Sequence, residues 1–189
     1  MQKIMPNEEK EKAEGRKRRI IVIVVSAIML LSTLGYSFMG FGKGPKTKEN
    51  YKGIDFELME DGWHFGIQGI NFVTMYLPSE TENISADILI SAQDYAGKPL
   101  YFSPDSLYEG VREIEKNLYF IAERMQYACL DYNCSSYAVK NCTTDSVILI
   151  KPGNETIISQ DENCILITAS QSEVVRASDK LLFKILGLA

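Results

Sequence analysis

The chain has 189 residues and a formal net charge of −5, and it is long enough to form one domain with a substantial core. The charge is unevenly divided, because residues 1–19 carry seven Lys or Arg and four Glu, a net of +3, so that residues 20–189 carry −8. A segment at −8 repels phosphate, which excludes nucleic acid and anionic lipid as its partners.

Residues 20–42 form an uncharged, mainly apolar run. As a helix this run would be about 34 Å long, against a hydrocarbon core of about 30 Å. A cleavable signal peptide is the alternative, but its apolar region is shorter and is followed by a cleavage site of small residues. This run is longer, and it carries the bulky residues Tyr36 and Phe38 near its C-terminal end. We predict a transmembrane helix, with the basic tail 1–19 in the cytoplasm by the positive-inside rule.

Small residues recur every seven positions along this predicted helix, at Ser26, Thr33 and Gly40. Such spacing lets two helices approach closely, so a homodimer through this seam is one hypothesis. Residues 43–53 are polar and contain Gly and Pro, which predicts a flexible stalk. The globular domain is expected at 54–189.

The pattern of residues 54–102 predicts strands. Alternation at 54–58 and 63–67 around Asp61 and Gly62 indicates a hairpin, and further strands are expected at 70–77, 86–90 and 99–102. Ser103 is a suitable N-cap for a long helix that ends near Tyr132. The predicted buried face of that helix consists of Leu107, Val111, Ile114, Leu118, Ile121, Met125 and Ala128.

The C-terminal part predicts a meander of three strands, at 147–150, 155–159 and 164–167. Ser170 and Glu173 have the spacing of a capping box that opens a last helix through Leu186. We therefore expect an α+β fold in which one transmembrane helix precedes a mainly antiparallel sheet, covered on one face by two helices.

The four cysteines all follow the apolar run, which predicts two disulfides in an oxidising compartment. Their spacing lacks the paired C-x2-C of structural zinc. Three pairings are possible, of which we favour Cys129–Cys164 with Cys134–Cys142. Four N-x-S/T sequons support the same location outside the membrane. They lie at Asn83, Asn133, Asn141 and Asn154.

Residues suited to catalysis are few. His64 is the only histidine, and no nucleophile motif accompanies it. Carboxylate pairs occur at Glu113 with Glu115 and at Asp161 with Glu162, without a calcium-binding pattern. No motif for a cofactor or metal is present, and ordinary surface roles are favoured for these side chains.

Tyrosines cluster in the middle of the chain. We expect them to serve in core and rim packing, in preference to forming a contact surface. They are Tyr95, Tyr101, Tyr108, Tyr119, Tyr127, Tyr132 and Tyr137.

The basic tail and anchor are followed by Gly62 and Trp63, a cysteine-bearing loop, the run N-C-I-L-I at 163–167, and the helix S-D-K-L-L-F-K-I-L-G at 178–187. In this combination the chain resembles single-pass membrane-anchored surface proteins of small-genome archaea. The resemblance implies an architecture and no particular activity.

Two functions are open at this point. The first is a non-catalytic binding or accessory module of the cell envelope or of a membrane complex, held outside the cell membrane by its single helix. The second is an anchored extracytoplasmic hydrolase that uses His64 or a carboxylate pair. Converging carboxylates at the floor of a deep pocket would favour the hydrolase.

Overall fold

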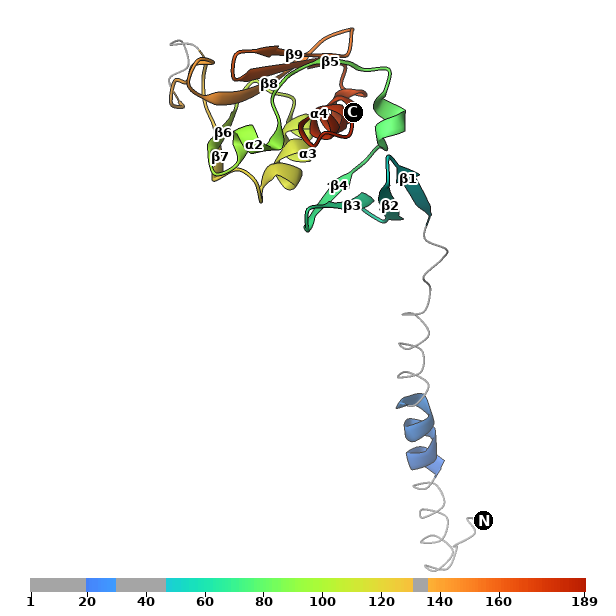
Figure 1. The fold of residues 1–189 in the computed structure, drawn as a ribbon. Coiled ribbons are helices and arrows are strands. Elements are labelled where there is room, and N and C mark those ends of the chain that lie inside the picture. The colour runs from blue at the N-terminus through green and yellow to red at the C-terminus, as the bar shows by residue number, and fades with distance from the viewer. Residues whose placement is uncertain (1–19, 30–46, 131–135) are drawn as a thin grey trace, which may run out of the picture. The chain divides into compact units, whose positions relative to one another are not determined.

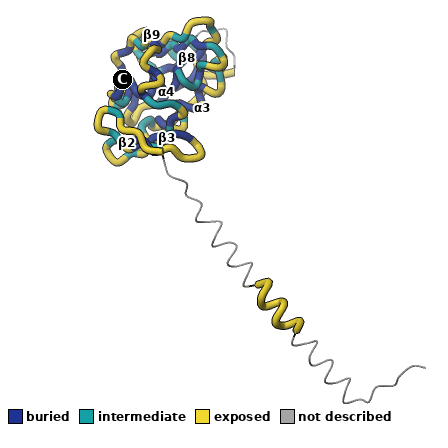
Figure 2. Tube along the Cα trace, turned by 90° about the vertical axis from the view of Figure 1, so that its right-hand side faces the viewer, coloured by how far each residue is buried: buried dark blue, intermediate teal, exposed yellow. Residues whose placement is uncertain are grey.

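The computed structural model describes residues 20–29, 47–130 and 136–189. Residues 20–29 are helical and exposed (Figure 2). Within the described ranges no helix combines the length and the apolar character needed to cross a membrane. The predicted tail 1–19 and the remainder of the predicted span, with Thr33 and Gly40, lie outside the described residues.

Residues Lys46–Ala189 form one compact unit (Figure 1). Its first sheet is an antiparallel meander with the strand order β1-β2-β3-β4. The strands are β1 (Lys48–Tyr51), β2 (Ile54–Met59), β3 (Gly62–Ile67) and β4 (Ile70–Thr74). The β2–β3 turn consists of Glu60 and Asp61, since Met59 pairs with Gly62. Gly62 has a φ of +134°, and a Cβ there would lie 2.5 Å from the Thr74 carbonyl oxygen, so the turn requires glycine.

The second sheet has six strands in the order β5-β9-β10-β8-β6-β7. Only β9 and β10 pair antiparallel, and the other four pairs are parallel. The strands are β5 (Ser85–Asp87), β6 (Pro99–Phe102), β7 (Arg124–Tyr127), β8 (Ser146–Pro152), β9 (Ile157–Asp161) and β10 (Cys164–Ala169). The helical elements are η1 (Pro78–Thr81), α2 (Ala92–Tyr95), α3 (Tyr108–Leu118) and α4 (Val174–Ile185).

The two long helices lie between the two sheets (Figure 1). The main core joins the six-stranded sheet to α3 and α4 through residues such as Ile114, Ile148 and Leu181. On its other side α4 places Phe183 against a cluster of phenylalanines from the meander. Helix α4 is therefore buried along most of its length, as Figure 2 shows.

The helices approach each other closely at Gly110. A Cβ on this residue would lie 2.7 Å from Val174 Cγ2, 2.8 Å from Ile150 Cδ1 and 2.9 Å from Ser178 Oγ. Glycine normally weakens a helix interior by about 1 kcal/mol relative to alanine. Here it permits the contact between α3, α4 and β8 that defines the core.

The α+β class is confirmed, but the prediction of one mainly antiparallel sheet is wrong. Strand β10 inserts between β8 and β9, so the expected meander does not form. The apolar runs at 147–150 and 164–167 are central parallel neighbours, and such strands are commonly buried on both faces. Two helices do cover one face of this larger sheet.

Three predicted boundaries also differ from the structure. Helix α3 ends at Leu118, and Met125 belongs to β7 instead, because the segment after the helix returns to pair with β6. The helix begins at Tyr108, so Ser103 is not its N-cap. Part of the predicted stalk, Lys48–Tyr51, is the edge strand β1. The spacing of apolar residues did not reveal the turn because Ile121 and Met125 still pack against the core.

The cysteines form disulfides, as predicted, but the favoured pairing is wrong. Cys142 is bonded to Cys164, with 5.0 Å between the two Cα atoms. Cys129 is also disulfide-bonded, and Cys134 lies outside the described residues. The Cys142–Cys164 bond fixes the loop before β8 to the start of β10. Together with Tyr101, Ala128 and Val147, these two cysteines form a small cluster separate from the main core.

Candidate functional site

A cleft of about 710 Å³ lies beside α3, bordered by β4 and the β2–β3 turn. Helix α3 contributes Tyr108, Glu109, Arg112, Glu113 and Lys116 to its wall. The opposite wall includes Asp61, Asn71, Val73 and Met75, with Phe120 and Val175 completing the lining. The cleft therefore combines charged side chains with apolar and aromatic ones.

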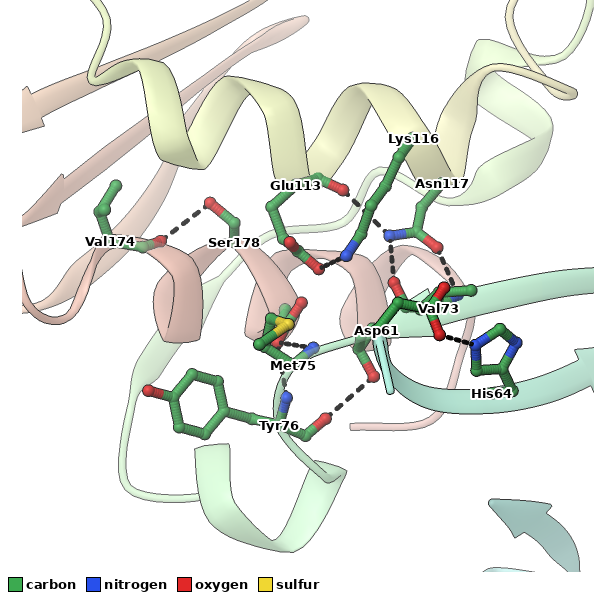
Figure 3. A network of polar contacts seen from close by, with 12 residues as sticks. Asp61, His64, Val73, Met75, Tyr76, Glu113, Lys116, Asn117, Val174 and Ser178 are labelled. Atoms are coloured by element: carbon green, nitrogen blue, oxygen red, sulfur yellow. Dashed lines mark hydrogen bonds and ion pairs between the residues drawn. The ribbon is translucent and has the colours of Figure 1, made fainter. Parts of the chain in front are cut away.

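The edge of β4 at this cleft is bonded to the helices by side chains. Asn117 Nδ2 donates to the Val73 carbonyl oxygen at 2.7 Å, and its Oδ1 accepts from the Val73 backbone N–H at 2.8 Å. Asp179 Oδ2 accepts from the backbone N–H groups of Met75 and Tyr76, both at 2.9 Å. Asn117 thus makes the bonds that a further strand would make, and it attaches the meander to α3 (Figure 3).

Two carboxyl groups are buried at the cleft: Glu113 belongs to its wall, and Asp179 lies behind that wall. Asp179 is fully buried and Glu113 is 6% exposed. Burial raises the pKa of Asp179 well above its usual range, and the charge and hydrogen bond of the neighbouring Glu113 raise it further. Burial therefore favours the protonated form of Asp179 over a wider pH range than for an exposed aspartate. Asp179 Oδ1 and Glu113 Oε1 are both buried and have no hydrogen-bond partner among the described residues.

Lys116 contacts the second carboxyl group of this pair, that of Glu113. Its Nζ lies 2.7 Å from Glu113 Oε1, although the angles fall short of a hydrogen bond, so the contact is an ion pair. Figure 3 shows the Lys116 and Glu113 side chains converging beside α3. The arrangement places two buried carboxyl groups close together, with the cation of Lys116 at the solvent side.

His64 and Asp61 form a hydrogen-bonded pair at the edge of the cleft. His64 Nε2 lies 2.6 Å from Asp61 Oδ1. This bond lowers the pKa of the Asp61 carboxyl. Asp61 lines the cleft, whereas His64 does not belong to its wall. Among the described residues no serine, threonine or cysteine side chain makes a hydrogen bond to His64, so the structure brings no nucleophile to it.

The outer side of α3 is rich in exposed aromatic residues. We define the α3 face as Tyr108, Arg112, Glu115, Tyr119 and Phe120. Tyr108 is 61% exposed, Tyr119 71% and Phe120 70%, and the Tyr119 and Phe120 rings meet edge to face at 5.3 Å. A second cleft, of about 600 Å³, runs along this face and shares Arg112, Lys116 and Phe120 with the first.

Strand β7 extends the aromatic surface beside the α3 face. Tyr127 is within electrostatic reach of Glu115 and Tyr108, and burial followed by the Glu115 charge raises its pKa. Its ring lies 6.0 Å from that of Tyr137, which is 45% exposed. The prediction that these tyrosines serve in core and rim packing holds for Tyr95 and Tyr101, which are buried, but not for this exposed group.

The predicted carboxylate pairs do not converge. Glu113 points into the protein, while Glu115, two positions further along α3, lies on the α3 face. Partial burial raises the pKa of Glu115. Asp161 and Glu162 lie at the exposed turn between β9 and β10, where Glu162 accepts a hydrogen bond from Thr143 Oγ1 at 2.7 Å. In the part of the chain that the structure describes, no cluster of three metal-binding side chains occurs.

Three predicted sequon asparagines are described, and all three are exposed. Asn83 accepts a hydrogen bond from Arg176 through its side-chain oxygen. Asn141 Oδ1 accepts from the backbone N–H groups of Thr143 and Thr144, both at 3.1 Å, which shapes the turn after it. Asn154 lies in the β8–β9 turn, and Asn133 lies outside the described residues.

Sequence reasoning missed Asp179 and Asn117. Asp179 follows Ala177 and Ser178 in a helix that is apolar on several sides, and a lone carboxylate there was a usable signal of a buried acceptor. Asn117 belongs to a regular helical pattern and gave no such signal.

Comparison with protein-family models, with curated proteins and with solved structures finds no match to the chain. The function is therefore inferred from the site alone.

Proposed function

We propose that the chain is a membrane-anchored binding module without catalytic activity, whose extracytoplasmic domain binds a protein through the α3 face. The observation that carries the proposal is the group of exposed aromatic rings on and beside α3. Monomeric proteins rarely expose such contiguous apolar surface unless it contacts a partner. Tyrosine and arginine, both present here, are enriched at the centres of protein interfaces.

The cellular location in this proposal comes from the sequence. The apolar run at 20–42 supplies the anchor, and the basic tail favours a cytoplasmic N-terminus. The Cys142–Cys164 disulfide supports an oxidising compartment for the domain. Exposed sequon asparagines are compatible with glycan addition, which takes place outside the cytoplasm.

Site-specific crosslinking tests the binding surface. A photo-reactive amino acid replaces Phe120 in the full-length protein, and a matched variant carries it at Leu58, an exposed residue of β2. We expect a protein adduct in the membranes of expressing cells from position 120 and none from position 58. Adducts at equal yield from both positions, or no adduct from position 120, would contradict the proposal.

Cysteine labelling of intact cells tests the location. The expected result is that a cysteine introduced at exposed Leu89 reacts with a membrane-impermeant reagent before lysis. A cysteine that reacts only after lysis would place the domain in the cytoplasm.

The buried carboxyl pair favours one second candidate, an anchored acid–base hydrolase. Glu113 lines the 710 Å³ cleft and lies beside Asp179, whose pKa is raised by burial, so Glu113 is the residue through which a proton could reach a bound substrate. The test is turnover of chromogenic glycosides and esters by the full-length protein and its Glu113→Gln variant. Turnover that is lost in the variant would favour the hydrolase, and turnover equal in both proteins would exclude this site as its source.

A further inference from the structure

Four residues of the α3 face form a single stripe along the helix. Tyr108, Arg112, Glu115 and Tyr119 follow one another at spacings of four, three and four residues. Residues at these spacings share one side of a helix and form the contact line when two helices pack side by side. Tyr119, the C-cap of α3, still has helical backbone angles, so the stripe continues through it.

The charged residues of the stripe differ from their neighbours in having no partner. Glu109 accepts a hydrogen bond from Gln171 at 2.8 Å, and Lys116 pairs with Glu113. The side chains of Arg112 and Glu115 make no hydrogen bond and no ion pair within the described part of the chain, although they carry opposite charges. The stripe therefore presents one cation and one anion, both available to a second molecule.

We propose that the occupant of the α3 face is a second copy of this chain, whose α3 packs antiparallel to the first. This inference rests on the proposed function, since it names the partner of the same surface. In the dimer Arg112 pairs with the partner's Glu115, and Tyr108 contacts the partner's Tyr119. The two-fold symmetry makes each contact twice, which is the self-complementary form of a symmetric dimer.

The order of residues in the stripe specifies this arrangement. In an antiparallel pair of helices the first position meets the partner's last, and the second meets the partner's third. Read in opposite directions, Tyr-Arg-Glu-Tyr meets Tyr-Glu-Arg-Tyr, so each ring meets a ring and each charge meets its opposite. A parallel pair in register would instead place Arg112 against Arg112. Phe120 and Tyr127 flank the stripe and supply further apolar area.

Charge reversal in the full-length protein tests the inference. The photo-reactive amino acid is placed at Tyr119, and the yield of crosslinked dimer is measured in membranes. Arg112→Glu and Glu115→Arg should each reduce that yield about tenfold or more, because each replaces two attractive pairs by two repulsive ones. The double variant should restore it to within about threefold of the parent. Lys48→Glu, on exposed strand β1, is the matched control and should leave the yield unchanged.

The outcomes separate this inference from the proposed function. Dimer adducts that are lost in both single variants and restored in the double variant support the dimer. Dimer adducts that are insensitive to charge reversal would overturn it, because contact would then arise elsewhere, for example through the predicted helix 20–42. An adduct with a different protein would overturn the dimer and retain the proposed function, and no adduct at all would overturn both.

Discussion

The raised pKa of the buried Asp179 carboxyl predicts an unusual dependence of stability on pH. The folded state raises the pKa of Asp179, whereas in the unfolded chain the carboxyl has its ordinary pKa, near 3.9. Between these two pKa values the folded protein holds a proton that the unfolded chain has released. The stability from this group is therefore fully present below the unfolded pKa and is lost as the pH rises towards the folded one, by about 1.4 kcal/mol per pH unit.

Asp179→Asn isolates this effect. The asparagine oxygen can accept from the backbone N–H groups of Met75 and Tyr76, and its amide can donate to Glu113, without a titrating proton. The free energy of unfolding of the native protein, minus that of the variant, should thus fall as the pH rises above the unfolded pKa, with a slope of at most about 1.4 kcal/mol per pH unit. The measurement is urea unfolding of the full-length protein followed by the fluorescence of Trp63, the only tryptophan.

Asp179→Ala is the companion variant. It leaves two backbone N–H groups without their acceptor and should lower the free energy of unfolding by about 3–5 kcal/mol at pH 5, with a difference from the native protein that declines at higher pH as it does for Asp179→Asn. If the difference between the native protein and Asp179→Asn were constant from pH 5 to pH 7, Asp179 would be ionised in the fold. The raised pKa of Asp179 would then be wrong.

Two further predictions concern packing, and both use the same unfolding measurement. Gly110→Ala should lower stability by about 1 kcal/mol, because overpacking against Val174 and Ile150 outweighs the gain in helix propensity; a more stable variant would show that α3 and α4 can separate at no cost. Tyr95→Phe should raise stability by about 1 kcal/mol, because the buried hydroxyl of Tyr95 has no hydrogen-bond partner in the described ranges, and a loss above 1 kcal/mol would indicate a partner for it.

Local patterns predicted the elements better than their assembly. The strand at 99–102 agrees with β6 at both ends, and the strands at 54–58 and 164–167 agree with β2 and β10 at their starts. These segments alternate or are continuously apolar, and such short-range patterns depend on neighbours along the chain. The helix predicted to end near Tyr132 is too long, because apolar residues of its second half face the core from the turn and strand after Leu118, and spacing alone does not distinguish a helix from such a segment.

In the candidate site, too, the features that depend on tertiary contacts could not be predicted from local sequence patterns. Exposure of the tyrosines on and beside α3 could not be predicted, because an aromatic residue at a helical spacing fits a core as well as a surface. The carboxyl pair joins Glu113 to Asp179, two residues far apart in the sequence on different helices. The pairing of Cys142 with Cys164 likewise depends on the position of β10 beside β8.

The sequence by itself determined the properties that depend on composition and local order: the apolar run, the −8 charge of residues 20–189, the even number of cysteines and the α+β class. Only the tertiary structure decided the strand order, the buried carboxyl pair and the exposed α3 face. The physical reason is that the hydrophobic effect is non-directional: it favours the burial of apolar residues but does not specify which of them contact one another. The contacts are specified by the fit between segments that are distant in the sequence, such as Gly110 against α4 and Asn117 against β4.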